Sequence, residues 1–466
     1  MEKNDRPKIC LSMTGKTIEE DLRVLEQYRS VVDCVELRAD CLDPSERFFI
    51  RDFPEKAGLP CILTIRRLKD GGKFEGGEGT RLVLIARALS FPKPDARANY
   101  AYVDLEDDFR APVVGGSCRT FGTRIIRSHH CLGGMPDSLD AAYEELTSEE
   151  DEIPRLTVNP QNSADFIRFL EWCLQKPRCD QILIASGDYG IASRILSWRL
   201  GSLWTYASPL RGGMDAAAPG HIDPFDLVNI YNFDLVDNDT MIYTLMGQNS
   251  IAKSLSPYLH NSAFRKMGKN ALLIPTPVDN CEDGLKMLEI LGGTGAAITV
   301  PFKQDILPYL SFHSTDVQLI GACNTLVLRE SGWAGYNTDA DGFERSLLEF
   351  LGKQDISGCK ATIIGAGGAA KSVALSLFRM GARGLVLNRT YSIGRDLARK
   401  YNFLYGHLDD RAIDLLLEYS DLIVQATSVG MENEGDPISF YEFKGSEAVF
   451  DLVYYPIKTL FLKRAE

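Results

Sequence analysis

The residues with the clearest chemical potential lie between positions 295 and 372. Lys303 ends the segment ITVPFK (298–303), and Asp339 lies in NTDADG (337–342). A lysine held beside an aspartate can deliver a proton to a carbonyl oxygen and stabilise the negative charge that develops there. Hydroxyl and amide side chains suited to a small hydroxylated acid are supplied by Ser254, Ser256, Thr299, Asn324 and Asn337.

A glycine-rich turn, GAGGAA (365–370), lies between the apolar segment ATII and the helix-like run AAKSVALSLFRM. Glycine permits a tight turn and lets the backbone approach a pyrophosphate, which the helix N-terminus would bind. The next predicted strand ends in an arginine, where an NAD enzyme usually carries an acid, and this favours the 2′-phosphate of NADP. The predicted cofactor-binding residues are Gly365, Ala366, Gly367, Gly368, Ala369, Asn388, Arg389 and Thr390.

The first half of the chain alternates short β-rich segments with amphipathic, helix-like segments. Eight such strands are predicted at 9–13, 34–38, 61–66, 102–106, 124–128, 155–158, 181–186 and 203–207. Eight strands with helical connections predict a (β/α)8 barrel, and barrel enzymes place their sites at the C-terminal ends of the strands. These ends carry Ser12, Glu36, Arg38, Arg66, Glu106, Ser128, His130 and Ser186, which together indicate an anion site.

Composition and length describe an α/β protein of several domains. With 466 residues we expect a barrel over 1–235, a catalytic domain over 240–345 and a Rossmann-type domain over 346–466, with a polar junction at 233–240. The formal charge of −13 argues against general nucleic-acid binding. Scattered cysteines and the lack of a secretory or membrane-spanning segment predict a reduced, cytoplasmic protein that acts on small molecules.

Several motifs of residues 241–466 resemble those of shikimate dehydrogenase: SLSPYLHN (254–261), ITVPFK (298–303), ACNT (322–325), NTDADG (337–342), GAGGAAKS (365–372), NRT (388–390), ATSVGM (426–431) and DLVYYP (451–456). The resemblance implies reversible, NADP-dependent reduction of 3-dehydroshikimate to shikimate. It makes Lys303 and Asp339 the catalytic dyad, with a substrate site at Ser254, Ser256, Thr299, Asn324 and Tyr454. Gln248 and Lys253 depart from the family pattern, and the family's terminal helix with its substrate-binding glutamine does not follow Glu466.

Residues 7–232 resemble type I 3-dehydroquinate dehydratase. The motifs are PKICLSM (7–13), VELRAD (35–40), TIRRLKDGG (64–72), YVDLE (102–106), SHHC (128–131), IPRLTVNPQNSAD (153–165), GIASR (190–194) and APGH (218–221). The resemblance implies substrate binding by Ser12, Glu36, Arg38, Arg66 and Arg194, and acid–base catalysis by His130.

The family's Schiff-base lysine falls on Arg155, and three further site positions fall on Asp70, Ala217 and His221. A guanidinium stays protonated and cannot attack a ketone, whereas an amine can. We therefore predict that the barrel does not dehydrate 3-dehydroquinate through an imine, unless Lys69 or Lys73 replaces the missing amine.

The leading interpretation is a bifunctional enzyme of the shikimate pathway. The first alternative keeps the dehydrogenase but treats the barrel as a non-catalytic binding or scaffold module. A second is an NAD-dependent quinate or shikimate dehydrogenase, against which Arg389 argues. A purely structural protein is least favoured, because it would not require Lys303, Asp339 and the glycine turn in this order.

Overall fold

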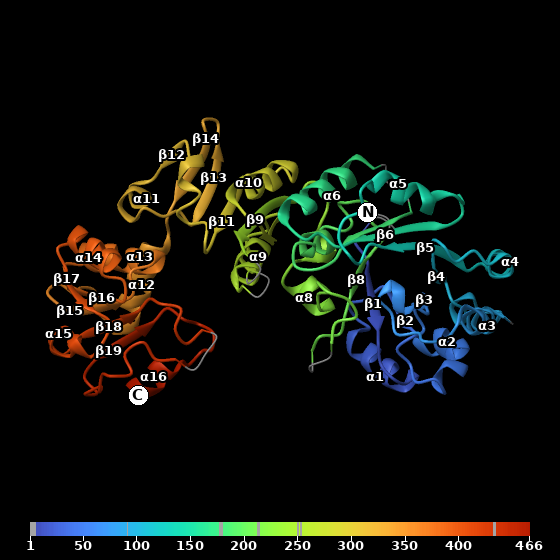
Figure 1. Ribbon diagram of the computed structural model, residues 1–466, viewed down its shortest axis with the longest axis horizontal. Coiled ribbons are helices and arrows are strands. Elements are labelled where there is room, and N and C mark those ends of the chain that lie inside the picture. The colour runs from blue at the N-terminus through green and yellow to red at the C-terminus, as the bar shows by residue number, and fades with distance from the viewer. Residues whose placement is uncertain are drawn as a thin grey trace. The chain divides into compact units, whose positions relative to one another are not determined.

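A computed structural model describes residues 6–90, 92–176, 180–211, 215–248, 251, 254–431 and 435–466 (Figure 1). The chain divides into two compact units, Met1–Ala297 and Ile298–Glu466. Within the described residues, no helix combines the length and the apolar character needed to span a membrane. The three domain boundaries expected from the sequence stay a prediction.

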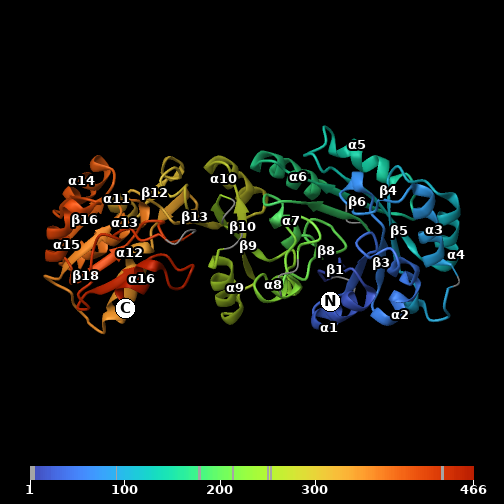
Figure 2. The ribbon, with the colours of Figure 1, turned by 60° about the horizontal axis from the view of Figure 1, so that its bottom comes forward.

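Eight parallel strands begin the first unit. They are β1 (Ile9–Met13), β2 (Cys34–Arg38), β3 (Cys61–Thr64), β4 (Tyr102–Glu106), β5 (Arg124–His130), β6 (Ile153–Val158), β7 (Ile182–Ala185) and β8 (Thr205–Ala207). The strand order runs from β7 down to β1 and then to β8, and a parallel bridge between Gln181 and Ser202 joins the two ends. The predicted (β/α)8 barrel is confirmed, and each predicted strand has a counterpart (Figure 2).

The helices around this barrel are α1 (Ile18–Tyr28), α2 (Phe53–Ala57), α3 (Glu78–Leu89), α4 (Pro112–Phe121), α5 (Leu139–Glu144), α6 (Ser163–Gln175), α7 (Ile191–Ile195) and α8 (Pro224–Asn229). Side chains cap several of them: Asn162, for example, accepts a hydrogen bond from Asp165 N at the start of α6. Cys10, Ile62, Ile126 and Trp204 belong to a buried apolar cluster inside the barrel. The interior of the barrel is therefore apolar in this layer.

Two parallel strands follow the barrel within the first unit, β9 (Met241–Gly247) and β10 (Ala271–Pro277). Helices α9 (Ser256–Lys266) and α10 (Cys281–Ile290) accompany them. All seven residues of β10 are buried, as its apolar sequence ALLIPTP requires. Strand β11 (Gly295–Ile298) carries the chain into the second unit.

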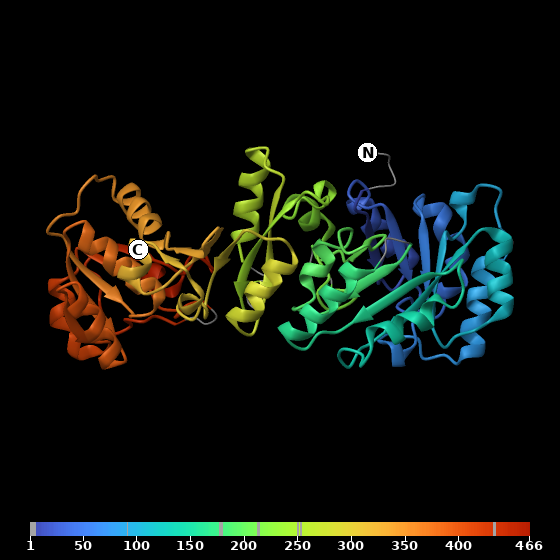
Figure 3. The same ribbon diagram turned by 90° about the horizontal axis from the view of Figure 1, so that it is seen from above.

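The second unit begins with β12 (Phe312–His313), α11 (Thr315–Ile320), an antiparallel hairpin of β13 (Thr325–Arg329) and β14 (Gly332–Tyr336), and α12 (Asp339–Leu351). A five-stranded parallel sheet follows, made of β15 (Lys360–Ile364), β16 (Arg383–Asn388), β17 (Leu404–His407), β18 (Leu422–Gln425) and β19 (Ala448–Asp451). Its helices are α13 (Gly368–Arg379), α14 (Tyr391–Lys400), α15 (Ile413–Glu418) and α16 (Leu460–Ala465), drawn in orange and red in Figure 3.

The order of this sheet is β17-β16-β15-β18-β19, so the chain reverses its direction of winding between β15 and β18. Ligands of open α/β sheets bind at such a switch point, outside the carboxyl ends of the strands. Val373 and Leu377 of α13 share a buried cluster with Ile363, whereas Leu385 belongs to a separate cluster with Phe461. The sheet is therefore apolar on both faces, which confirms the Rossmann-like class.

Candidate active sites

Lys303 and Asp339 are in contact in the second unit. Lys303 Nζ donates to Asp339 Oδ2 at 2.5 Å, although the two residues are separated by 36 positions. Both side chains keep some solvent access, with exposed fractions of 20% and 32%. A lysine in this setting can exchange its proton with a ligand, which a fully enclosed ion pair could not do.

Asparagine side chains fix the orientation of the Asp339 carboxylate. Asn324 Nδ2 donates to Asp339 Oδ1 at 2.7 Å, and the Asp339 backbone N–H donates to Asn337 Oδ1 at 3.0 Å. Asn337 is buried and also donates to the Ala322 carbonyl at 2.9 Å. Asp339 at the start of α12 is thus held by Asn324, just before β13, through its carboxylate, and by Asn337, just after β14, through its backbone N–H.

The positions of the other predicted substrate-binding residues follow from the elements beside them. Thr299 is half-buried beside β11, and Tyr454 is exposed beyond β19. Ser254 and Ser256 lie at the start of α9 in the first unit, where Ser254 Oγ accepts from Ser256 N at 3.2 Å. Gln248 is exposed, and Lys253 lies outside the described residues. Their predicted roles stay predictions.

The glycine turn has the geometry that a close ligand requires. Gly365 has φ of +108°, and a Cβ atom there would lie 2.9 Å from Thr427 Cγ2 at the end of β18. At Gly367 and Gly368, by contrast, an added Cβ would meet nothing within 4 Å. The first glycine is needed for strand packing, and the next two leave the N-terminus of the twelve-residue helix α13 open to a phosphate.

Strand β16 ends beside this turn, since β15 and β16 pair in parallel. Asn388 Nδ2 donates to the Thr390 carbonyl at 2.9 Å and closes the turn into α14. Arg389 and Thr390 are exposed, and Arg389 forms no ion pair in the described parts of the chain. An exposed arginine with no counter-ion at this edge suits a phosphate group.

In the barrel, Arg155 is enclosed by acids. Its Nη1 lies 2.7 Å from Asp104 Oδ2 and 3.5 Å from Glu36 Oε1, and it donates to the Tyr206 hydroxyl at 3.1 Å. The guanidinium carbon also lies 4.0 Å from the centre of the Tyr206 ring. Ser12 donates to the second Glu36 oxygen at 2.6 Å. Arg155 is therefore a buried arginine paired with two acidic side chains through Nη1, while its Nε has no hydrogen-bond partner among the described residues.

The charges around Arg155 reinforce one another. Burial by itself would lower the pKa of Arg155, but Tyr206, Asp104 and Glu36 outweigh burial and raise it above its ordinary value. Burial would raise the pKa of Asp104, yet the guanidinium groups of Arg66 and Arg155 hold it below the ordinary range. Both groups remain charged over the pH range in which proteins fold, so Arg155 cannot act as a nucleophile.

His130 lies against an arginine rather than an acid. Its Nε2 contacts Arg66 Nη1, and Arg66 Nη2 donates to Asp104 at 3.0 Å. Burial, followed by the positive charges of Arg66 and Arg155, lowers the pKa of His130 well below its ordinary value. The neighbouring His129 instead pairs with Asp107 at 2.7 Å, and this hydrogen bond raises the pKa of His129 to about 10. The surroundings of His130 therefore favour the neutral imidazole.

The two remaining arginines predicted to bind substrate, Arg38 and Arg194, differ in their partners within the protein. Arg38 forms a bidentate pair with Asp40 at 2.9 and 2.8 Å. Arg194 is buried and donates to the carbonyls of Tyr206 and Pro219, at 3.4 and 3.1 Å, with no carboxylate partner among the described residues. Burial, and then the charge of Arg155, lowers the pKa of Arg194 to about 9. An anionic ligand would compensate this guanidinium.

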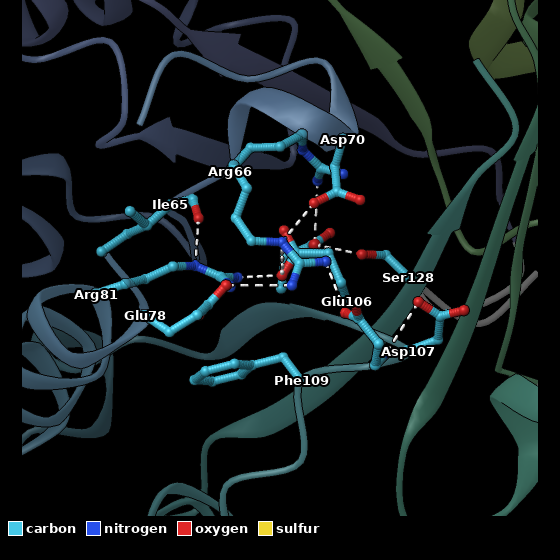
Figure 4. A network of polar contacts seen from close by, with 12 residues as sticks. Ile65, Arg66, Asp70, Glu78, Arg81, Glu106, Asp107, Phe109 and Ser128 are labelled. Carbon is cyan, nitrogen blue, oxygen red and sulfur yellow. Dashed lines mark hydrogen bonds and ion pairs between the residues drawn. The ribbon is translucent and has the colours of Figure 1, made fainter. Parts of the chain in front are cut away.

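The loop after β3 holds its charged groups in a separate network. Arg81 donates to the Ile65 carbonyl at 2.7 Å and pairs with Glu78 and Glu106 (Figure 4). Arg67, which is adjacent, binds Asp70 at 2.5 Å. Asp70 and Glu106 are therefore engaged by arginines of this loop and helix.

Lys69 and Lys73 were considered as possible replacements for the family's Schiff-base lysine, and Lys69 is already paired with an acid of this loop region. Lys69 Nζ donates to Asp108 at 2.6 Å, and this hydrogen bond raises the pKa of Lys69. A lysine kept protonated by a carboxylate is a poor amine nucleophile. The backbone N–H of Lys73 donates to Asp40 at 3.0 Å.

Two important residues were missed by sequence reasoning, Asp104 and Tyr206, whereas Asn337 was predicted to bind a ring hydroxyl and instead accepts from the Asp339 backbone. Asp104 carried a signal, because an acid in the middle of the apolar strand YVDLE alternates with Tyr102 and Glu106 in a way that a buried strand tolerates only when the charge is paired. Tyr206 reads as an ordinary strand aromatic, and no local pattern indicates that it supports a cation.

Comparisons with known proteins cover both halves of the chain. Residues 9–238 match the model of type I 3-dehydroquinase. Residues 245–326 match the shikimate dehydrogenase substrate binding domain, and residues 349–431 match shikimate / quinate 5-dehydrogenase.

Individual relatives agree with these matches. A chloroplastic bifunctional 3-dehydroquinate dehydratase/shikimate dehydrogenase of Arabidopsis thaliana is 28% identical, over 98% of this chain and 77% of the relative. A shikimate dehydrogenase (NADP(+)) of Pyrococcus furiosus is 35% identical, over 50% of this chain and 83% of the relative. A crystal structure of shikimate dehydrogenase in complex with NADP+ is 30% identical over 49% of this chain and 82% of its own, with a TM-score of 0.45.

The fold and the sites define a class of two-part α/β enzymes, in which a parallel barrel precedes a Rossmann-like unit that carries a lysine–aspartate pair. The matched models and relatives narrow this class. The chain belongs to the shikimate dehydrogenase family and carries a type I 3-dehydroquinase domain before it.

The ion pairs of Arg155 with Asp104 and Glu36 lead to a prediction about the stability of the protein. Arg155→Ala should lower the free energy of unfolding by about 3–5 kcal/mol, because it removes one of the two guanidinium groups that pair with the buried Asp104 carboxylate. Arg155→Lys retains a positive charge and should cost clearly less. Urea unfolding followed by circular dichroism measures both, and an Arg155→Ala variant as stable as the parent would contradict the ion-pair assignment.

Proposed function

We propose that the dehydrogenase half catalyses the reversible, NADP-dependent reduction of 3-dehydroshikimate to shikimate. The observation that carries this proposal is the contact between Lys303 and Asp339 at 2.5 Å. The family membership of the chain supports the substrate, and the relatives named as NADP(+)-dependent support the cofactor.

The residues of this chain account for the proton in such a reaction. When bound, the nicotinamide supplies the hydride to the carbonyl carbon. Lys303 then donates a proton to the carbonyl oxygen, and Asp339 stabilises the ammonium group before transfer. Asn324 holds the carboxylate so that its second oxygen stays directed at the lysine. In this proposal Ser254, Ser256, Thr299 and Tyr454 bind the carboxylate and ring hydroxyls of the substrate.

The glycine turn and β16 fit a phosphorylated dinucleotide. Gly367 and Gly368 leave space at the start of α13, where unpaired N–H groups face outward. Arg389 is exposed and free of a counter-ion within the described residues, so it can bind a 2′-phosphate. This arrangement favours NADP over NAD, and it disfavours the alternative of an NAD-dependent quinate or shikimate dehydrogenase.

For the barrel we propose that it does not dehydrate 3-dehydroquinate through an imine. Arg155 is tied to Asp104 and Glu36, and Lys69 is tied to Asp108. A carboxylate ligand could still be held by Arg194, which has no acidic partner in the described residues. The barrel is then a binding or structural module attached to an active dehydrogenase.

We also propose boundaries for the functional domains and a cellular location for the protein. We retain 1–235, 240–345 and 346–466 as the functional domains, consistent with where the matched regions begin and end. All cysteines that the structure describes are free thiols, which supports a reduced, cytoplasmic location.

Removal of the lysine tests the reductase assignment. Lys303→Ala should lower kcat for 3-dehydroshikimate by about 10²- to 10⁴-fold, because proton delivery is lost, while the Kd for NADPH changes little. Steady-state kinetics and fluorescence titration measure the two quantities. The matched control is Lys353→Ala, an exposed lysine of the same unit. Turnover at the parental rate in Lys303→Ala would remove the assignment.

Cofactor preference tests the role of Arg389. Arg389→Ala should raise the KM for NADPH by about 10- to 100-fold, as expected for the loss of a charged hydrogen bond, and leave the KM for NADH within about twofold. Arg383→Ala, at the opposite end of β16, is the control. An equal rise for both cofactors would show that Arg389 does not contact the 2′-phosphate.

Chemical trapping tests the barrel. Treatment with 3-dehydroquinate and borohydride should leave the mass of the protein unchanged, because the barrel offers no free amine at position 155. A type I enzyme with the lysine present serves as the positive control. Intact-mass spectrometry that detected a reduced adduct, mapped to any lysine of residues 9–238, would overturn the proposal.

A further inference from the structure

The barrel and the segment 240–297 belong to the same compact unit, and a defined set of contacts joins them. We call this set of contacts the seam. Helix α6 of the barrel packs against α10, and α7 packs against β10 (Figure 2). Strand β10 is the terminal strand of its sheet, so one of its edges has no strand partner. Such edges need to be covered, and the barrel contributes to the cover here.

A first polar clamp in the seam centres on Asp279, in the turn between β10 and α10. Its Oδ2 accepts from Ser163 N at 2.8 Å and from Ser163 Oγ at 2.9 Å, and its Oδ1 accepts from the Tyr189 hydroxyl. Burial would raise the pKa of Asp279, but the hydrogen bonds from Tyr189 and Ser163 lower it. Ser163 begins α6 and Tyr189 precedes α7, so one carboxylate binds the loops after two adjacent barrel strands.

A second clamp is formed by Arg199, which follows α7. Its guanidinium donates to the Thr240 carbonyl at 2.9 Å and to the Leu291 carbonyl at 3.1 Å. These carbonyls lie just before β9 and just after α10, so a single barrel side chain fixes both ends of the β9–α10 segment. A surface hollow of about 320 Å³ lies beside Thr240 and Tyr231.

The contacts continue from the seam to the predicted substrate serines. Asn261 of α9 is fully buried, donates to the Leu273 carbonyl at 2.9 Å and accepts from Leu273 N at 2.6 Å. This pair fixes α9 on β10, the strand against which α7 packs. Ser254 and Ser256 lie at the start of α9. The path from barrel to serines is therefore a continuous series of packed elements and hydrogen bonds.

We propose that the barrel is a structural partner of the 240–297 segment, and that it sets the affinity of the dehydrogenase for its hydroxy-acid substrate by holding β10 and α9 in place. Arg199 and Asp279 are positioning residues in this proposal. The role needs no turnover in the barrel, and it gives a barrel without a catalytic amine a physical function. The substrate part of the inference rests on the proposed dehydrogenase function, and the association part does not.

The first experiment tests association in the full-length protein. A protease site is inserted between Asn238 and Asp239, in the exposed turn before β9, and the chain is cut after folding. Native mass spectrometry and size-exclusion chromatography should show the two fragments still bound to each other, and Arg199→Ala should make them separate at concentrations at which the parent stays joined. Fragments of the parent that separate immediately after cleavage would overturn the proposal, whatever the activity of the protein.

The second experiment measures kinetics on uncut variants. Arg199→Ala should raise the KM for shikimate at least fivefold and leave the KM for NADP within twofold, which general destabilisation would not do selectively. Tyr189→Phe removes only one surface hydroxyl, folds with less risk than Arg199→Ala, and should shift the same KM in the same direction. Lys286→Ala, which deletes the exposed pair with Glu171 in the same seam, is the matched control and should change neither value.

The outcomes separate the two proposals. If Arg199→Ala and Tyr189→Phe both give the KM values of Lys286→Ala, the seam does not control the substrate segment and the inference is wrong. If the parent shows no shikimate oxidation, the proposed function fails, while fragment association still decides whether the barrel is a structural partner.

Discussion

A charge that cannot be neutralised inside the barrel constrains everything that the barrel can do. Arg155 keeps its proton, so the acidic side chains of Asp104 and Glu36 are held close to it. Because Asp104 also binds Arg66, the position of His130 is fixed by the same carboxylate. The inner layer of the barrel is therefore held together by paired charges.

The pair formed by Lys303 and Asp339 has the same two types of charge and the opposite consequence. It is partly open to solvent, and the carboxylate is oriented by Asn324 and Asn337 rather than by further cations. A lysine with one carboxylate neighbour and an open side can pass a proton to a ligand. The two pairs thus differ in burial and in the number of counter-charges as well as in the type of the basic residue.

Local sequence patterns were sufficient to predict many of the strands and helices. The alternation in YVDLE and the apolar run ATII each predicted a strand, and β4 and β15 occupy these segments. The glycine turn after β15 was predicted from three features that are adjacent in sequence: strand, glycines and helix. Strand ends were less accurate, as β5 continues to His130 and β6 begins at Ile153. Edges of strands depend on partners from elsewhere in the chain, which no local pattern contains.

By itself, the sequence determined the order of the strands and helices, the presence of Arg155 within a predicted barrel strand, and the presence of an arginine after β16, because these follow from residue type and spacing. Only the tertiary structure decided that Lys303 meets Asp339, that Asp104 and Tyr206 enclose Arg155, and that Arg199 joins the barrel to the next segment. Each of these contacts brings together residues that are far apart along the chain. Their distances are set by the packing of whole elements, which individual residue types do not specify.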